Sequence, residues 1–327
     1  MRATLILNPA ARSGRTGRMA DAVLAEARRA GLDPTLRLTE RPRHAAHLAA
    51  EAANSGAEAV VAVGGDGTVH EVAEGLVRAG VPVPLGVVPM GTGNDFAKMV
   101  GAAPGGRVRP WREALASLVG ASVRAVDVGW VRWEEATGEG GGEKGEGGKG
   151  RAPSSPLSLR SSPFFNAVGM GFDARVAVEA PRFKRLGGTL AYLAAIGAVL
   201  RKWEAVHLTA RTADGTVLID GPFFLATAGN GVSSGGGFYL TPEARVDDGL
   251  LDVCAVDSIS VARILTLIPL VMRGRHTREP EAHFARTTAL SLELSAPCAI
   301  HVDGEVATRD AVRVEVHVEA GALRVLG

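Results

Sequence analysis

The sequence predicts an α/β domain built on a parallel sheet, followed by a second domain that is mainly antiparallel β structure. Strand-like and helix-like segments alternate through residues 1–122, and such alternation favours a parallel sheet covered by helices on both faces. Strand-like segments dominate residues 123–327, and several alternate apolar and polar residues, as Val312–Val318 does. A chain of 327 residues is also long for one domain, so two domains are the natural expectation.

The elements of the first domain follow from the spacing of apolar residues. Thr68 and Glu71 have the spacing of a capping box, which predicts that a helix begins at Thr68. Because ligands of such sheets bind at the carboxyl ends of the strands, we expect a site in the loops that follow them. The expected strands are Ala3–Asn8, Pro34–Thr39, Val60–Val63 and Pro84–Pro89, and the expected helices are Thr16–Ala30, Arg43–Asn54 and Thr68–Ala79.

The second domain contains a run of strand-like segments and two helices. Residues 134–163 are rich in glycine and charge and lack periodicity, which predicts a disordered hairpin tip without a part in chemistry. The nearly uncharged run Leu186–Leu200 is too short to span a bilayer as a helix. The expected strands are 123–133, 164–171, 205–211, 216–227, 250–256, 289–295, 298–306 and 312–319, and the expected helices are Leu186–Trp203 and Val261–Gly274.

Composition narrows the class of protein. Hydrophobic residues make up 46% of the chain and charged residues 22%, which is ordinary for a globular protein with a substantial core. The formal net charge of +1 gives no reason to expect nucleic acid as a partner. The start of the chain does not resemble a signal peptide. Cys254 and Cys298 lie in apolar runs, so we expect reduced core residues and a cytoplasmic setting.

Two glycine loops follow predicted strands. In the first, Gly64–Thr68, glycines let backbone amides approach an anion and the next helix points its positive end at the same place, which predicts a phosphate cradle. Asp66 would repel phosphate unless a metal ion or a proton transfer explains it, and a bare glycine turn is the alternative. The second loop, Pro89–Phe96, lacks the third glycine of a dinucleotide fingerprint. Together the two loops predict one nucleotide lying across the edge of the sheet.

These two loops resemble the catalytic domain of the diacylglycerol kinase and sphingosine kinase superfamily, especially its bacterial soluble lipid kinases. The segments that carry the likeness are GGDGTVHEVAEGL and PLGVVPMGTGNDFAK, then Asn8-Pro9 with Ser13-Gly14, NAVGMGFDARV, GNGVSSGGGFYLTPEARVDDGLLDV and HVDGEV. They come in the family's order over nearly the whole chain. The resemblance implies a Rossmann-like first domain similar to NAD kinases and phosphofructokinases, a β-sandwich second domain, and an active site in the cleft between them.

The resemblance also implies an ATP-dependent phosphoryl transfer to a lipid hydroxyl, with Mg²⁺ as cofactor. It places a catalytic acid at Glu305, a structural magnesium at Asp248 with the backbone carbonyls of Arg245 and Leu250, and substrate contacts at Asp95 and Asp173. His70 stands where the commonest bacterial form has asparagine. The implied nucleotide-binding residues are Asn8, Thr39, Gly64, Gly65, Asp66, Gly67, Thr68, Gly91, Thr92 and Asn94.

Several roles stay open from the residues alone. Asp66 could hold a catalytic Mg²⁺ or take the proton of the lipid hydroxyl, and Glu305 competes for the second role; we favour Glu305 as base and Asp66 at metal and phosphate. Asp173 is either a contact for the lipid head group or a helix N-cap. Gly231–Gly235 matches the serine hydrolase elbow G-x-S-x-G, but the residues after it cannot open a helix well, which argues against a hydrolase.

Partners and competing functions are also open. The two helices of the second domain have basic flanks, which fits either core helices with solvated ends or helices that line an acyl pocket and rest on anionic lipid. We therefore expect peripheral contact with a membrane surface, and a homodimer is compatible with the sequence. The competing functions are a soluble-substrate kinase of the NAD kinase type and a non-catalytic nucleotide-binding regulator.

Overall fold

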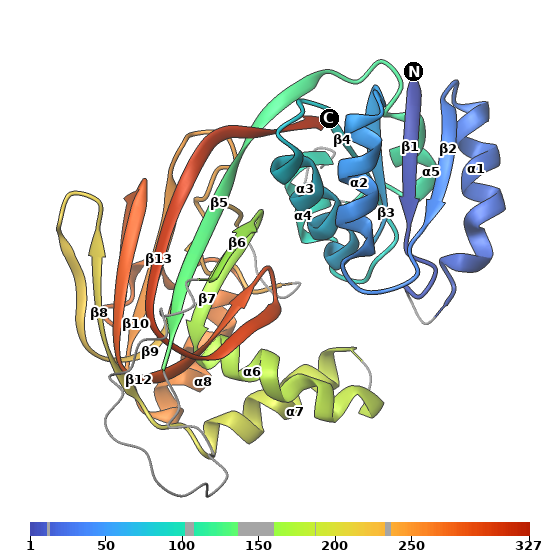
Figure 1. Ribbon diagram of the computed structural model, residues 1–327. Helices are drawn as coiled ribbons and strands as arrows, with labels where there is room; N and C mark the ends of the chain where they lie inside the picture. Colours follow the sequence, from blue (N-terminus) through green and yellow to red (C-terminus); the bar gives the residue numbers. More distant parts are fainter. Residues whose placement is uncertain (12–13, 102–107, 137–159, 187, 233–236) are drawn as a thin grey trace, which may run out of the picture.

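The computed structural model describes residues 1–11, 14–101, 108–136, 160–186, 188–232 and 237–327 (Figure 1). The chain forms an α/β domain, blue to teal in the figure, and a β-rich domain, green to red. This confirms the predicted fold class. The predicted disordered tip falls largely on residues 137–159, and the serine of the G-x-S-x-G match is Ser233; both lie outside the described residues.

The α/β domain has a parallel sheet in the order β4-β3-β1-β2. Every residue of β3 is buried, as a central strand covered on both faces requires. Helices α2, α3 and α4 pack on one face of the sheet, and α1 and α5 pack on the other. The bounds are β1 Arg2–Leu7, η1 Gly17–Met19, α1 Ala20–Arg29, β2 Asp33–Leu38, α2 His44–Asn54, β3 Ala59–Gly64, α3 Asp66–Ala79, β4 Leu85–Pro89, α4 Asp95–Gly101 and α5 Trp111–Ala116.

The predicted capping box at the start of α3 is wrong. The helix begins at Asp66, two residues before Thr68, and no side chain caps it. The carboxylate of Glu71 instead accepts the backbone N–H groups of Arg43 (3.0 Å) and Ala45 (3.1 Å) at the start of α2. Glu71 therefore satisfies the unpaired amides of the neighbouring helix rather than those of its own.

The β-rich domain is mainly antiparallel and carries three α-helices among its described residues, α6, α7 and α8. Both cysteines are buried and unpaired within it, as expected of core residues. The bounds are β5 Val123–Glu135, β6 Arg160–Phe164, β7 Ala167–Gly171, α6 Phe172–Glu179, η2 Ala180–Leu186, α7 Gly188–Leu200, β8 Val206–Thr212, β9 Val217–Gly229, β10 Leu251–Asp257, α8 Val261–Val271, η3 His276–Arg278, β11 Ala282–Thr287, β12 Ala289–Val302 and β13 Glu305–Leu326.

Some boundaries in this domain differ from the prediction. The predicted strand 164–171 is two strands, because Asp303 captures the backbone N–H groups of Phe165, Asn166 and Ala167 at the break between β6 and β7. Both ends of the predicted loop 134–163 belong to strands, since β5 runs to Glu135 and β6 starts at Arg160. Segments 289–295 and 298–302 form one strand, β12, which contains irregular pairing. Helix α6 and strand β11 were not predicted.

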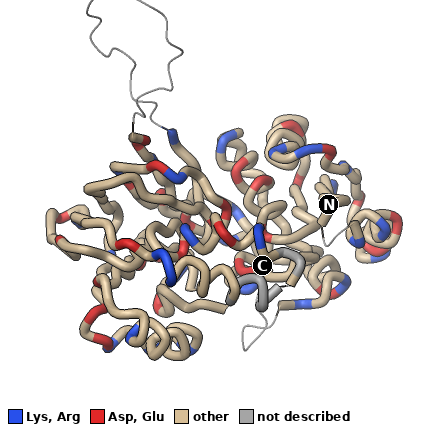
Figure 2. The backbone as a smooth tube through the Cα atoms, turned by 90° about the horizontal axis from the view of Figure 1, so that it is seen from below, with Lys and Arg blue, Asp and Glu red and all other residues tan. Residues whose placement is uncertain are grey.

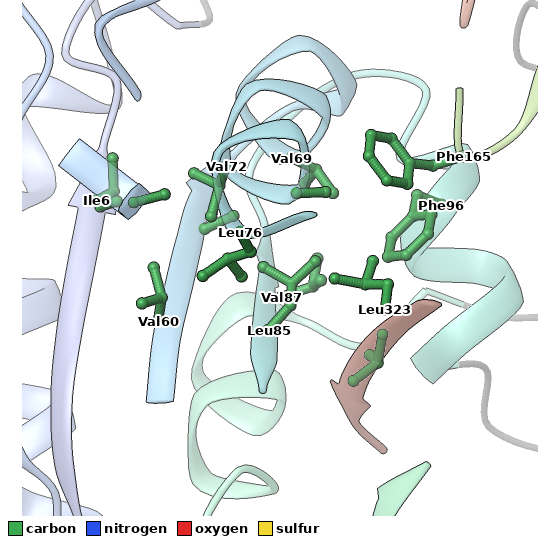
Figure 3. Close-up of a cluster of buried hydrophobic side chains, with 14 of the residues drawn as sticks. Ile6, Val60, Val69, Val72, Leu76, Leu85, Val87, Phe96, Phe165 and Leu323 are labelled. Carbon is green, nitrogen blue, oxygen red and sulfur yellow. The ribbon is translucent and has the colours of Figure 1, made fainter. Parts of the chain in front are cut away.

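The last strand joins the two domains. Strand β13 pairs with β5 along residues 311–326 and, through Val325, in parallel with Leu85 of β4. Figure 3 shows Phe165 and Leu323, both from the β-rich domain, packed beside Val69 and Phe96 of the α/β domain. One hydrophobic core therefore continues across the junction, which fixes the loops of the α/β domain against those of the other.

Charges and apolar helices are distributed as follows. Basic and acidic residues are interspersed along the described chain (Figure 2). Among the described residues, no helix combines the length and the apolar character that crossing a bilayer requires. Helices α6, α7 and α8 lie at the same end of the β-rich domain (Figure 1).

Candidate active site

The residues expected to bind nucleotide come together at one edge of the parallel sheet. Asn8, Thr39 and Gly65 each follow the last residue of a parallel strand, and the second glycine loop follows β4 in the same way. Parallel strands place their carboxyl ends at one edge, so these residues become neighbours although they lie far apart in sequence. The side-chain oxygen of Asn8 accepts the Ala10 N–H at 3.0 Å, which shapes the loop after β1.

The two glycine loops pack directly against each other. A Cβ on Gly65 would lie 3.1 Å from Gly91 Cα, and a Cβ on Gly91 would meet Gly65 Cα and lie 2.9 Å from Asn94 Oδ1. A Cβ on Gly93 would lie 2.7 Å from Asp66 Oδ2. Glycine is required at these positions for contact between the loops, in addition to any approach of a phosphate.

Asp66 ties the two loops together. The backbone N–H of Asn94 donates to Asp66 Oδ2 at 2.7 Å, and the backbone N–H of Asp95 donates to Asp66 Oδ1 at 2.6 Å. Burial, followed by the charge of Asp95, raises the pKa of Asp66 although these main-chain bonds oppose the shift. Asp66 is thus the anchor for the first turn of α4, a role that the sequence alone did not reveal.

Asp95 and Asn94 are held within the second loop. Asp95 is buried, and its Oδ1 accepts Lys98 Nζ at 2.7 Å. Asn94 adopts a left-handed backbone conformation (φ 53°), and its side chain bonds both the N–H and the carbonyl of Gly91. Thr92 is exposed at the tip of this loop. Of the predicted residues of this loop, Thr92 is therefore the one whose side chain faces solvent.

Glu305 of the β-rich domain lies against the first glycine loop. It follows a two-residue turn between β12 and β13 whose residues Asp303 and Gly304 both have positive φ, 49° and 87°, as a type I′ hairpin turn requires. Glu305 is exposed, and its Oε1 lies 3.5 Å from the point where a Cβ on Gly67 would stand. The structure therefore brings the predicted acid of one domain to the predicted phosphate cradle of the other.

A largely buried pair, His70 and Asp303, connects the two domains beside this contact. His70 Nδ1 lies 2.7 Å from Asp303 Oδ2. Burial lowers the pKa of His70, but the hydrogen bond and charge of Asp303 outweigh it and raise the pKa above its ordinary value. Burial raises the pKa of Asp303, but His70 and the backbone N–H groups of Phe165 and Ala167 hold it below its usual range. The Asp-Gly dipeptide was the one sequence signal for this turn; the pairing with His70 had none.

The carboxylate of Asp248, the one side-chain ligand of the predicted metal, is engaged by protein groups. Asp248 forms an ion pair with Arg286, and its Oδ1 accepts the Leu250 N–H at 3.1 Å. Asp252 lies 3.6 Å from the same guanidinium, and burial raises its pKa although Arg286 opposes the shift. The described residues contain no cluster of three His, Cys, Asp or Glu side chains suited to a metal. In the described structure the guanidinium of Arg286, rather than a metal, faces Asp248, and the metal at this turn stays a prediction.

Asp127 holds the turn that carries Asp248 and was not predicted. It is buried, its Oδ2 accepts the Gly249 N–H at 2.7 Å, and its Oδ1 accepts the Gly321 N–H at 2.8 Å. The turn at Asp248 is therefore fixed to β5 and β13 by a carboxylate that bonds only main-chain groups in the described structure. A single aspartate in a strand-like run gave no sign of this in the sequence.

An apolar cavity of about 480 Å³ lies between the sheet and helices α6, α7 and α8. Its wall includes Asp173, His301 and Gly304, so it reaches the turn that precedes Glu305. Asp173 lies in the first turn of α6, whose N-cap is Gly171, and the N-cap alternative for Asp173 is therefore wrong. Most of the other lining residues are apolar, among them Phe172, Ile196, Phe224, Ile264, Leu267 and Ile268.

Comparison with protein families identifies both parts of the chain. Residues 2–131 match the model of the diacylglycerol kinase catalytic domain, and residues 166–327 match that of the YegS C-terminal NAD kinase beta sandwich-like domain. The fold is similar to that of a crystallised diacylglycerol kinase from Bacillus anthracis strain Sterne, with a TM-score of 0.66 at 19% identity over 99% of this chain and 96% of that one. It is also similar to that of a yeast NADH kinase, with a TM-score of 0.51 at 10% identity over 100% and 79% of the two chains.

Two curated relatives resemble the chain over most of its length. A diacylglycerol kinase of Mycobacterium tuberculosis is 28% identical over 99% of this chain and 94% of its own length. A protein of Xanthomonas euvesicatoria named "Probable lipid kinase YegS-like" is 32% identical over 88% of this chain and 85% of its own length. Because this relative is 32% identical over 88% of the chain and both domain models are matched in order, the chain belongs to the diacylglycerol kinase and YegS-like family of lipid kinases.

Proposed function

We propose that this lipid kinase uses ATP and Mg²⁺ to phosphorylate a hydroxyl group of a diacylglycerol-like lipid. One observation carries the proposal: Glu305 Oε1 lies beside the first glycine loop, and the apolar cavity ends at the same turn. A lipid whose chains fill the cavity would thus present its polar end between an exposed carboxylate and the loop expected to hold phosphate. Phosphoryl transfer depends mainly on such positioning and on charge stabilisation.

The nucleotide phosphates would bind at the start of α3. In the described structure no side chain caps this fourteen-residue helix, so the N–H groups of its first turn have no side-chain acceptor. Unpaired N–H groups and the positive end of a helix together favour a phosphate. Asn8, Thr39 and Thr92 stand in the loops around the same sheet edge and would contact the rest of the nucleotide.

Mg²⁺ would enter with the nucleotide near Asp66. Asp66 and Asp95 place two carboxylates close together, and burial, followed by the charge of Asp95, raises the pKa of Asp66. A divalent cation at this place suits carboxylate oxygens and would neutralise phosphate charge. Because both oxygens of Asp66 already accept main-chain N–H groups, we assign the general base to the exposed Glu305 instead.

The lipid would enter from an anionic membrane surface under helix α8. The inner face of this helix lines the cavity with Ile264 and Leu267, while Val261, Leu265 and Met272 on its outer side are 46%, 56% and 51% exposed. Arg273, Arg275 and Arg278, all exposed, follow the helix, and in the described part of the chain none of them is in an ion pair with an acidic side chain. An apolar face bordered by unpaired arginines is complementary to an anionic bilayer.

Vesicle binding tests the membrane contact. Leu265→Asp is expected to abolish co-sedimentation with vesicles of phosphatidylglycerol and phosphatidylcholine, because a carboxylate would be carried into the bilayer interface. Val217→Asp is the matched control, since Val217 is 44% exposed but lies at the start of β9. Equal binding of the wild-type protein to neutral and to anionic vesicles would contradict the electrostatic part of this contact.

Transfer of radiolabelled phosphate from ATP to a panel of lipids tests the activity itself. The panel contains a diacylglycerol, a sphingoid base, a ceramide and phosphatidylglycerol, each with and without Mg²⁺. Mg²⁺-dependent labelling of a lipid, lost in Glu305→Gln and retained in the exposed control Glu315→Gln, supports the proposal. Labelling of NAD in place of lipid would indicate a soluble-substrate kinase, and ATP binding without any transfer would indicate a regulator.

A further inference from the structure

His301 stands where the lipid cavity meets the turn that carries Glu305. It is a buried residue of β12, two positions before Asp303, and it lines the cavity. Its Nε2 lies 3.1 Å from Asp173 Oδ2, and its Nδ1 accepts the backbone N–H of Gly304 at 3.3 Å. A single imidazole therefore touches both the cavity wall and the turn.

The two contacts together define which ring nitrogen carries the proton. Because the Gly304 N–H can only donate, Nδ1 must be the unprotonated nitrogen. The proton is then on Nε2, which donates to the carboxylate of Asp173. His301 thus acts as a neutral bridge with one acceptor end and one donor end, and neither end can exchange roles without breaking a bond.

Neighbouring strands are built around this bridge. His301 on β12 is in register with Gly169 on β7, which is in register with Thr227 on β9. A Cβ on Gly169 would collide with both Asp173 Oδ2 and His301 Nε2, so the absence of a side chain there makes the contact possible. Thr227 Oγ1 also donates to Asp173 Oδ2, at 3.3 Å. Three strands and α6 therefore converge on one carboxylate oxygen.

We propose that His301 is a positioning residue that orients the Asp303–Gly304 turn, and with it Glu305, and that it links this orientation to Asp173 at the wall of the lipid cavity. The inference rests on the proposed function for its catalytic consequence. In the described structure, His301 Nδ1 is the one acceptor found for the Gly304 N–H, and Glu305 is the next residue along the chain. A lipid hydroxyl that bonds Asp173 competes for the oxygen that receives the His301 proton, so occupancy of the cavity is transmitted to the turn.

Two substitutions separate the two ends of the bridge. The amide of asparagine reaches the place of Nδ1, and that of glutamine reaches the place of Nε2. His301→Gln is therefore expected to keep the contact with Asp173 and to release the Gly304 N–H. His301→Asn is expected to do the reverse. A His301 that only filled space would respond to the two substitutions alike.

Hydrogen exchange at the Gly304 amide is the first readout, and it does not depend on kinase activity. We expect exchange to accelerate at least about tenfold in His301→Gln and to stay near the wild-type rate in His301→Asn, because an amide without an acceptor loses its protection. Gly169→Ala keeps both side chains, but its Cβ would collide with Asp173 Oδ2 and His301 Nε2, so the two must move apart; it should weaken the contact with Asp173 as His301→Asn does. Equal exchange in His301→Gln and His301→Asn would overturn the proposal.

Steady-state kinetics with a short-chain diacylglycerol in detergent micelles is the second readout. His301→Gln should lower kcat about tenfold or more with KM nearly unchanged, since it disturbs Glu305, whereas His301→Asn should mainly raise KM for the lipid. His283→Gln serves as control, because His283 pairs with Asp257 (3.0 Å) in the same domain but does not itself line the cavity, and should leave both constants unchanged. If the wild-type protein labels no lipid, the proposed function fails while the exchange experiment still decides the role of His301. A parallel loss of kcat in both His301 variants would contradict the positioning role.

Discussion

Asp66 and Glu305 both lie at the first glycine loop, but the chain holds their carboxylates in opposite ways. Both oxygens of Asp66 accept main-chain N–H groups, at 2.7 and 2.6 Å, whereas no hydrogen bond reaches the carboxylate of Glu305 in the described structure. A carboxylate with both oxygens bonded organises the backbone, and one that faces solvent on a hairpin turn can exchange a proton with a substrate. The α/β domain thus supplies a fixed anionic frame, and under the proposed function the β-rich domain would supply the reactive group.

Glu305→Gln tests the solvent-exposed carboxylate of this pair and should have the largest effect. Glutamine keeps the size of the side chain but cannot take the proton of a hydroxyl, so we expect kcat to fall by roughly 10²–10⁴. Since Glu305 is exposed, the free energy of unfolding should change by less than about 0.5 kcal/mol. Lipid kinase assays and urea unfolding of the same preparation measure both values. If the variant keeps near wild-type kcat, the general base must be a residue other than Glu305.

Asp66→Asn tests the carboxylate whose two oxygens hold the backbone, and we expect stability and activity to fall together. The amide NH₂ would face one of the two N–H donors, at Asn94 or Asp95, so one bond to a charged acceptor is lost. We expect a loss of about 1–3 kcal/mol in the free energy of unfolding, together with weaker ATP binding. Urea unfolding and calorimetric titration with ATP give the two numbers. Unchanged stability combined with lost activity would mean that Asp66 acts mainly on metal or substrate.

The sequence was sufficient for the fold class and for the sheet edge where the site lies. Parallel strands must place Asn8, Thr39 and Gly65 at one edge, so strand assignment alone brought these residues together. The bonds of Asp66 to the second loop could not be predicted in the same way. Asp66 lies 28 and 29 residues before its partners Asn94 and Asp95, and it bonds their main-chain N–H groups, which do not depend on the type of side chain. Periodicity describes which face of an element is buried and not where a loop amide points.

The β-rich domain shows the same limit more strongly. Asp303 captures three amides of the β6–β7 connection from about 137 residues away, and this divides what reads as one strand. Asp127 fixes the turn at Asp248 through Gly249 and Gly321 by a similar main-chain pattern. Each case is a buried or largely buried aspartate that satisfies backbone donors from distant segments, and such a residue looks in sequence like any aspartate in a strand or turn.

The pair His70 and Asp303 should make the stability of the protein depend on pH. It joins the α/β domain to the turn that precedes Glu305. The pKa of His70 is raised in the folded state, so its contribution is fully present below its unfolded value near 6.5 and is lost as pH rises through the higher folded value. The pKa of Asp303 is lowered, so its contribution is present above about 3.9 and is lost as pH falls through the lower folded value. The pair therefore stabilises most between about pH 4 and 6.5.

Replacement of His70 isolates this effect. His70→Gln should cost about 2 kcal/mol near pH 5.5, and the difference from wild type should shrink as pH rises through 8, measured by urea unfolding at several pH values. Glu74 and Glu305 also face His70, and both favour its charged form. His47→Gln is the matched control, because His47 pairs with Glu51 on an exposed helix surface and should change stability by less than about 0.5 kcal/mol. A constant difference between wild type and His70→Gln from pH 5.5 to 8.5 would show that the histidine is neutral throughout.

Gly67→Ala should have the smallest effect on stability, and it tests the contact between the first glycine loop and Glu305. A methyl group at Gly67 would make ordinary van der Waals contact with Glu305 Oε1 at 3.5 Å, and φ at this position is not left-handed. Because Gly67 lies in the first turn of α3, alanine is compatible with the helix and should change the free energy of unfolding by less than about 1 kcal/mol. Gly91→Ala provides the contrast, since its methyl group would meet Gly65 Cα and should cost about 1–3 kcal/mol. If Gly67→Ala raises KM for ATP while stability is kept, its methyl group obstructs the phosphate and does not disturb packing. This is the behaviour expected of a glycine that is needed for the ligand and not for the packing of the loop.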